Sequence, residues 1–209
     1  MVSQLEGRGG PDSRSGSERR LFVAVDIGDV VRKELAEAIE SVAGDGPDRG
    51  GRGDGGGLRW IDAAIWHVTL QFLGPVAAGR VDDARLACAF GAGRIRAFTA
   101  EFCGAGAFPS ARRARIVWIG TGEGSDSLAN LSTEVQAQTA KRGFESESRK
   151  FHPHVTVARA KVPRDVSAML GSLHLPSVRM DVGELTLFES HLGTSSARYE
   201  VVDVFPLQS

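Results

Sequence analysis

Two short segments of this chain carry the same pattern: a histidine, an aliphatic residue, a threonine and a second aliphatic residue. The first is His67-Val68-Thr69-Leu70 and the second is His154-Val155-Thr156-Val157. In both places the neighbours are apolar and β-branched, which favours a strand over a helix or a loop. Because side chains alternate along a strand, each histidine shares one face with its threonine, and the aliphatic residues point into a core.

Each segment therefore presents an imidazole and a hydroxyl on a rigid strand. Two such strands facing each other form a small site with two acid/base groups and two hydroxyl donors. The alternative is that both histidines are half-buried strand residues with ordinary neighbours. One copy alone fits that alternative well, but two copies in matching strand contexts, one in each half of the chain, favour a shared site.

Length and composition bound the rest. A chain of 209 residues can bury a substantial core and fits one domain, or one domain with two lobes. The formal net charge of −1 provides no global attraction to nucleic acid, so an anionic ligand must be held by local arginines. No apolar run reaches membrane-spanning length. Cys88 and Cys103 are too few for a disulfide framework, and we expect reduced, mostly buried thiols in a cytoplasmic protein.

The remaining pattern predicts strands and helices in both halves of the chain. We expect strands at residues 20–27, 58–60, 66–73, 97–104, 116–120, 151–159, 180–189 and 197–206. We expect helices at residues 29–42, 81–90, 125–142 and near 165–170. This order predicts an α+β fold of two similar antiparallel lobes with helices around a central cleft, one His-x-Thr strand in each lobe.

Two stretches fall outside this pattern. Residues 1–19 are polar and rich in Gly, Ser and Arg, which predicts a disordered tail before a folded domain at residues 20–207. Residues 44–57 are glycine-rich and formally contain the phosphate-cradling G-x-G-x-x-G. They lack the preceding strand and following helix that this motif needs, so a flexible surface loop is favoured. Arg112, Arg113 and Arg115 either gather phosphates or lie in a solvated loop.

Two histidines flanking one anionic centre suit phosphoryl transfer between oxygens. One imidazole takes a proton from an attacking hydroxyl or water while the other, protonated, gives one to the leaving oxygen. Threonine hydroxyls donate to phosphate oxygens, and a nearby arginine neutralises the charge that gathers there. No metal is required, and two histidines without a carboxylate or Cys at suitable spacing make a poor metal set. A Ser-His-Asp hydrolase is disfavoured because the G-x-S-x-G elbow is missing from the sequence.

Six stretches in a fixed order carry a likeness to a known family. They are residues 20–26, 67–74, 104–110, 151–159, 187–190 and 197–201. Together they resemble the two-histidine phosphoesterases, and among them the bacterial and archaeal RNA 2′,3′-cyclic phosphodiesterases, historically called 2′-5′ RNA ligases. The resemblance extends from about Arg20 to Leu207. The residues before Arg20 and the glycine-rich stretch depart from it, and neither falls on a catalytic motif.

The resemblance implies hydrolysis of RNA 2′,3′-cyclic phosphate ends to 2′-phosphates, with neither metal nor cofactor, and in effect the reverse chemistry in 2′-5′ joining of tRNA halves. It implies that His67 and His154 are the acid/base pair, and we assign His67 as proton donor and His154 as proton acceptor. Thr69 and Thr156 would hold the phosphate.

Phe72 and Arg159, each five residues after a motif histidine, would form walls for the terminal base and phosphate. An odd offset on a regular strand points to the opposite face, so this placement requires a bend or a strand end. His152 lacks a threonine partner and follows a weaker pattern, whereas His174 and His191 are expected at the surface.

The expected partner is an RNA or oligonucleotide with a cyclic phosphate end, and the protein is expected to be a cytoplasmic monomer without membrane contact. Two other functions stay open. One is a related two-histidine esterase acting on a small cyclic nucleotide or an ADP-ribose cyclic phosphate. The other is a module that binds RNA or nucleotide without turnover, although binding alone needs no pair of titrating imidazoles.

Overall fold

The computed structural model describes residues 18–43, 57–192 and 197–209, with the side chains of 41–43 and 192 left aside. The expected tail over residues 1–19 lies outside these ranges apart from its last two residues, which already belong to a strand that begins at Glu18. The expected loop over residues 44–57 lies outside them apart from Gly57. Among the described residues, no helix is long and apolar enough to cross a membrane.

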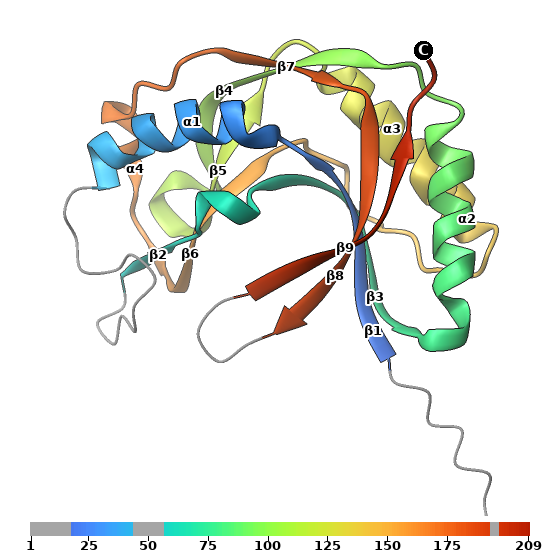
Figure 1. Cartoon of the computed structure of the whole chain (residues 1–209). Coiled ribbons are helices and arrows are strands. Elements are labelled where there is room, and N and C mark those ends of the chain that lie inside the picture. Colours follow the sequence, from blue (N-terminus) through green and yellow to red (C-terminus); the bar gives the residue numbers. More distant parts are fainter. Residues whose placement is uncertain (1–17, 44–56, 193–196) are drawn as a thin grey trace, which may run out of the picture.

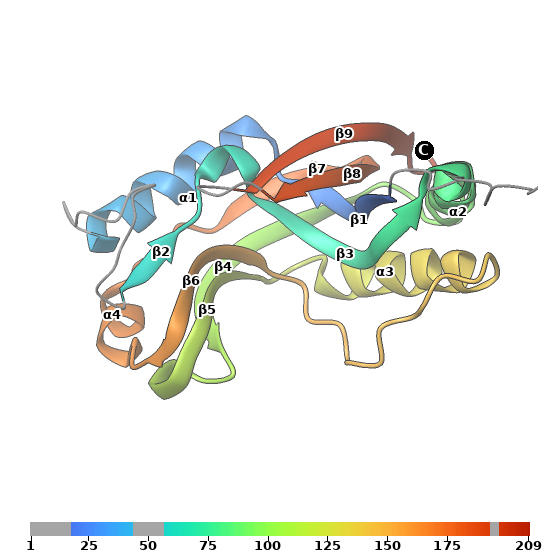
Figure 2. The same ribbon diagram turned by 90° about the horizontal axis from the view of Figure 1, so that it is seen from below.

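One antiparallel sheet of nine strands dominates the molecule (Figures 1 and 2). Its strands are β1 (Glu18–Asp26), β2 (Leu58–Trp60), β3 (His67–Ala77), β4 (Phe98–Phe108), β5 (Ala114–Thr121), β6 (Val155–Arg164), β7 (Val178–Val182), β8 (Glu184–Leu192) and β9 (Ala197–Pro206). The α-helices are α1 (Gly28–Ala43), α2 (Val81–Ala92), α3 (Ser125–Ala140) and α4 (Ser167–Ser172). Short 3₁₀ turns are η1 (Ala63–Ile65), η2 (Ala78–Arg80) and η3 (Ala111–Arg113).

The strand order β7-β4-β5-β6-β3-β1-β8-β9, with β2 paired to β6, divides the sheet into two halves that meet between β6 and β3. Each half contributes one His-x-Thr segment at this junction. The α+β class with two antiparallel halves is confirmed. The two motif strands are neighbours in one continuous, curled sheet and do not face each other from separate sheets (Figure 2).

The two faces of the sheet have different roles. One face carries the main core, to which the inward residues of the strands contribute together with Leu35 of α1, Cys88 of α2 and Leu131 of α3. The other face carries a small separate cluster of Phe22, Ala24 and Phe188, with Tyr199 packed against it. The long helices therefore cover one face and leave the other to the motif side chains.

Several expected strands end elsewhere in the structure, since β3 continues past residue 73 to Ala77 and β4 past residue 104 to Phe108. Two further differences have a clear physical reason. The strand expected from residue 151 begins at Val155, since Pro153 lacks an N–H for a sheet hydrogen bond. The single strand expected at residues 180–189 is two strands, because the chain leaves β7, paired with β4, at Gly183 and enters β8, paired with β1 and β9. Gly183 and Glu184 interrupt the apolar pattern, but nothing local shows that its two parts pair in different halves of the sheet.

Gly106 on β4 makes room for the ring of Trp118, its partner on β5. A Cβ atom at residue 106 would lie 2.3 Å from Cζ2 and 2.4 Å from Cη2 of this ring. The same indole packs against the rings of Phe108 and His154, with centroids 5.2 Å and 6.3 Å away. The missing side chain at residue 106 thus permits the aromatic wall beside the second motif histidine.

The substitution Gly106→Ala should displace this indole and lower the free energy of unfolding by about 1–3 kcal/mol, the usual cost of overpacking. Urea denaturation measures it, and the tryptophan fluorescence of the folded protein should change as well. The matched control is Gly171→Ala in α4, where an added Cβ meets nothing within 4 Å. Equal free energies of unfolding in the two variants would contradict the steric argument.

Candidate functional site

The site begins with one residue pair in the sheet, Val68 of β3 opposite Val155 of β6. Both valines are fully buried in the core. In this antiparallel register His67 lies across from Thr156, and Thr69 lies across from His154. Because alternate residues of a strand share a face, all four polar side chains emerge on the face away from the core. The structure therefore brings the four residues of the two motifs together.

The His67 ring has a defined orientation. Its Nδ1 lies 2.8 Å from the carbonyl oxygen of Ile65 and its Nε2 lies 3.0 Å from Oγ1 of Thr69. A carbonyl only accepts, so Nδ1 carries the proton, and in the neutral ring Nε2 accepts from the threonine hydroxyl. The rings of Phe22 and Tyr199 pack around it, with centroids 5.0 Å and 5.2 Å away.

The second motif repeats the Nδ1 contact with the backbone. Nδ1 of His154 lies 2.7 Å from the carbonyl oxygen of His152, again two residues earlier in the chain. Aromatic rings surround it as well, with the Phe108 centroid 5.2 Å away in an edge-on contact. In both histidines the Nδ1 proton is committed to the backbone, which leaves Nε2 as the atom available for proton transfer.

Burial among these rings sets the protonation of both imidazoles. It lowers the pKa of His67 to about 4, against raising effects of the Ile65 carbonyl and of the Asp26 carboxylate, while Arg159 and Arg32 lower it further. The pKa of His154 is also lowered, first by burial, with smaller lowering effects from His152 and Arg159. Arg159 thus lowers the pKa of both rings.

A bulge at the same offset in each motif explains the placement of Phe72 and Arg159. Between the pairs Ala24–Thr69 and Val23–Gln71, strand β3 contains the extra residue Leu70. Between the pairs Trp118–Thr156 and Val117–Ala158, strand β6 contains the extra residue Val157. Both extra residues stand three positions after the motif histidine, and each is followed by a second buried residue.

After the bulge the alternation is reversed, so the fifth residue after each histidine emerges on the face of the motif side chains. Phe72 is 58% exposed, and its ring lies 5.9 Å from that of Phe22, which itself contacts His67. Arg159 is exposed and acts on both imidazoles. The bulges supply the bend that the odd offset requires.

Buried polar side chains stabilise the bulge of β3. Ser132 Oγ of α3 donates to the Leu70 carbonyl oxygen at 2.8 Å, and Thr139 Oγ1 donates to Gln71 Oε1 at 2.8 Å. The Gln71 amide in turn donates to the carbonyl oxygen of Glu145 at 3.0 Å. These contacts tie α3 and the segment after it to the point where Phe72 changes face.

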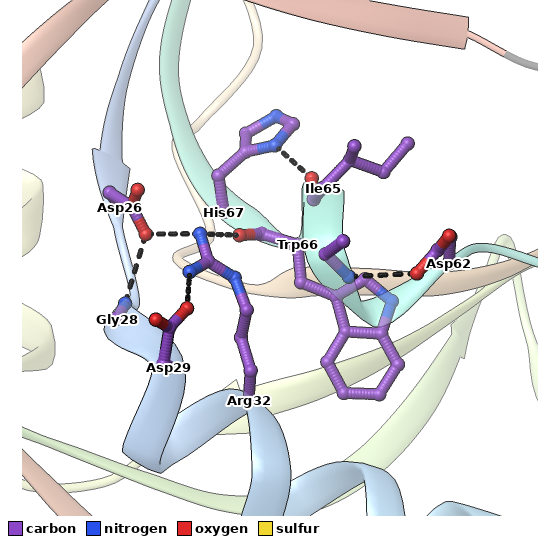
Figure 3. Close-up of polar contacts among 9 residues, drawn as sticks. Asp26, Gly28, Asp29, Arg32, Asp62, Ile65, Trp66 and His67 are labelled. Atoms are coloured by element: carbon purple, nitrogen blue, oxygen red, sulfur yellow. Dashed lines mark hydrogen bonds and ion pairs between the residues drawn. The ribbon is translucent and has the colours of Figure 1, made fainter.

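An ion pair supports the His67 side of the site (Figure 3). Asp26 is the sheet partner of His67, and its carboxylate binds Nη2 of Arg32 and accepts from Gly28 N at 2.9 Å. Arg32 also pairs with Asp29 at 3.0 Å and reaches the carbonyl oxygen of Trp66, the residue before His67, at 3.5 Å. The carboxylate beside His67 is therefore held in place.

Some of these residues were not assigned a role from the sequence. Two of them had a sequence signal that could have suggested a role. Asp26 is a charged residue at the end of an apolar strand, and Phe22 is an aromatic residue in a run of aliphatic ones. Phe188, Tyr199 and Trp118 offered none, because their approach to a histidine depends on strand pairing.

The other histidines take no part in the paired motif. His152 lies beside it, with its ring centroid 5.0 Å from Trp118 and 6.3 Å from His154. His174 is exposed, and His191 Nε2 lies 3.3 Å from a carboxylate oxygen of Glu200. Within the described ranges, no group of three or more His, Cys, Asp or Glu side chains is placed to hold a metal ion.

Comparison with known proteins identifies the family. A family model described as the 2′-5′ RNA ligase superfamily matches residues 55–194 of this chain. The matched region contains both motif strands, both bulges and Arg159. The chain belongs to the 2′-5′ RNA ligase superfamily.

Curated relatives share a name. The RNA 2′,3′-cyclic phosphodiesterase of Aeropyrum pernix is 34% identical over 143 residues, which cover 62% of this chain and 78% of that protein. The RNA 2′,3′-cyclic phosphodiesterase of Escherichia coli strain K12 is 31% identical over 185 residues, which cover 87% of this chain and 92% of that protein.

Solved structures share the fold. The protein TT0787 of Thermus thermophilus has a TM-score of 0.71 at 23% identity, covering 90% of this chain and 98% of that one. Escherichia coli LigT in complex with 3′-AMP has a TM-score of 0.65 at 29% identity, covering 92% of this chain and 99% of that one.

The His67 ring should titrate near pH 4 in the free protein, since burial among aromatic rings disfavours the imidazolium. Inorganic phosphate bound on the same face should raise this pKa, because a nearby anion favours the charged ring. Histidine ¹H–¹³C NMR spectra recorded against pH, with His67→Gln to assign the signal, measure both effects. A midpoint at or above 6.5 in the free protein would contradict the burial argument.

Asp26→Asn and Arg32→Gln should move the His67 pKa in opposite directions. The first removes the carboxylate that raises it and the second removes a guanidinium that lowers it. The same NMR titration measures both shifts, and Arg94→Gln, in the turn after α2, serves as the charge control. Shifts of the same sign in both variants would show that the ion pair acts through the fold of the strand instead of through its charges.

Proposed function

We propose that this protein hydrolyses the 2′,3′-cyclic phosphate at the end of an RNA to a 2′-phosphate. The observation that carries the proposal is the Val68–Val155 register, which sets two imidazoles and two threonine hydroxyls on one face beside Arg159. The names of the curated relatives support the choice of substrate.

The proposed reaction is an in-line displacement at phosphorus. Nε2 of His154 takes a proton from water as the water oxygen bonds to phosphorus, and the bond to the 3′ oxygen breaks. Nε2–H of His67 gives its proton to that departing oxygen. Thr69 and Thr156 donate to the non-bridging oxygens, and Arg159 neutralises the charge on them. With an RNA 5′-hydroxyl in place of water, the same steps form a 2′-5′ linkage.

The surroundings of the two rings support this division of roles. Asp26 favours the imidazolium of His67, as an acid requires, whereas no carboxylate of the described residues is among the groups that act on His154. A lowered pKa keeps His154 neutral and able to accept a proton near neutral pH. His67 must be protonated in the complex, and the anionic cyclic phosphate supplies part of the needed stabilisation.

The proposal includes a metal-independent reaction and a cytoplasmic, monomeric enzyme. The acid, the base and the charge-stabilising groups that the reaction needs are all side chains of the two motifs and Arg159. Cys88, which is buried, and Cys103, which is partly buried, are both free thiols, in keeping with a reducing compartment. Phe72 would stack on the terminal base.

In EDTA, the protein should convert an oligonucleotide with a 2′,3′-cyclic phosphate into one with a 2′-phosphate. His67→Ala and His154→Ala should each lower turnover roughly 10²–10⁴-fold, the scale for loss of one acid or base. Thr69→Ala or Thr156→Ala should lower it about 10–10²-fold through loss of one charge-assisted hydrogen bond. Chromatography of the product ends measures the rates, with His174→Ala as the control.

Three results would overturn the proposal: no conversion in EDTA, a 3′-phosphate product, or near-normal rates in both folded histidine variants. A substrate with a good leaving group at the 3′ position separates the roles of the two histidines. It should restore turnover in the variant that lacks the acid and leave the variant that lacks the base slow. Faster turnover of a free cyclic nucleotide than of the RNA end would favour the small-molecule esterase. Tight binding without turnover at any pH would favour a binding module.

A further inference from the structure

The two halves of the sheet differ in how their positive charges are neutralised. In the half that carries His67, three arginines are paired with acids. Arg19 Nε donates to Glu189 at 2.7 Å, and Arg198 lies 3.5 Å from a carboxylate oxygen of Glu200. Arg32 is bound by Asp26 and Asp29.

The half that carries His154 contains a run of cations without such partners. Its members are Arg112 and Arg113 of η3 and Arg159, Lys161 and Arg164 of β6, here called the basic track. All five are exposed, and no carboxylate in the described part of the chain forms an ion pair with any of them. The pKa of Asp165 is lowered first by its hydrogen bonds with Ser167 and also by the charge of Arg112, so one acid acts on this end of the track without forming an ion pair with it. In a chain with a net charge of −1, the basic track is a local surplus of positive charge.

The basic track starts at the motif site and follows β6 to its end. Arg159 acts on both imidazoles, and Lys161 follows two residues later on the same face of β6. Arg164 ends the strand as the sheet partner of the buried Ala114, so its position alternates away from that of Arg159, and it lies opposite the residue that directly follows Arg112 and Arg113. From Arg159 to Arg164 the strand covers at most roughly 16 Å.

We infer that the basic track binds the phosphodiester backbone of a single-stranded RNA upstream of its terminal cyclic phosphate. This inference rests on the proposed function, which places the terminal phosphate between the two histidines. A polyanion that leaves this point meets cations without ion-pair partners along β6, whereas in the other half Arg19, Arg32 and Arg198 are already paired with acids. Neutralising RNA phosphates releases counterions, so the contribution of the track is favourable and depends on salt.

The test compares a short and a long substrate, a dinucleotide and a single strand of about twelve nucleotides, both ending in a 2′,3′-cyclic phosphate. The variants are the double substitutions Lys161→Gln with Arg164→Gln and Arg112→Gln with Arg113→Gln. The control is Arg94→Gln with Arg96→Gln, in the turn after α2, which removes the same charge. For each protein, kcat/KM is measured on both substrates between about 50 and 200 mM salt, and anisotropy measures affinity for the long 2′-phosphate product.

Both track variants should keep the wild-type kcat/KM on the dinucleotide and lose the advantage of the long strand. Each phosphate contact on a single strand contributes about 0.7 to the slope of log affinity against log salt. Each double variant removes two such contacts, so its slope should become less steep by about 1.4. If the wild type hydrolyses the dinucleotide and the track variants have the same kcat/KM on the long strand as the control, the inferred role of the basic track is wrong and the proposed function stands. If wild type hydrolyses neither substrate, the proposed function fails, and the anisotropy slopes alone decide the track.

Discussion

The pairing of Val68 with Val155 is the constraint on which the rest of the site depends. It is the one residue pair that joins β3 to β6. A slip of one residue along either strand would turn a histidine and a threonine into the core and expose the valines. Both valines are fully buried, so such a slip would cost both their burial and the desolvation of two polar groups. The hydrophobic core therefore determines how the two histidines and two threonines are placed relative to one another, although these side chains lie outside it.

The two halves of the molecule share the same local backbone features but carry different side chains at one position. In each, a ring nitrogen donates to the carbonyl two residues earlier, and a bulge stands three residues after the histidine. The position exposed by the bulge is aromatic in one half, at Phe72, and cationic in the other, at Arg159. A repeated backbone frame with unlike side chains suits a ligand that is itself unsymmetrical, with an apolar base at one end and a charged phosphate at the other.

The sequence was sufficient where structure follows local pattern. The alternation of apolar and polar residues located the motif strands and the faces of His67 and His154, because a strand with one buried side has apolar residues at every second position. It was insufficient where distant segments pair. The split of β7 from β8 depends on which strands each of them meets. Thr139 interrupts an apolar helical stripe, and only the contact with Gln71 of the β3 bulge explains it. The joining of the motif strands edge to edge likewise has no local signature.

The remaining physical problem is to make two chemically equal imidazoles act unequally. Burial lowers the pKa of both, so the free protein holds both rings largely neutral near pH 7. Of the two rings, His67 alone has a carboxylate among the described residues, Asp26, that favours its charged form, and Arg32 both holds that carboxylate and moderates its effect. Arg159 disfavours the charged form of either ring until an anion binds beside it. If the pair works as proposed, the acid is completed by the substrate: the phosphate offsets Arg159, Asp26 decides which ring takes the proton, and water meets the ring that stays neutral.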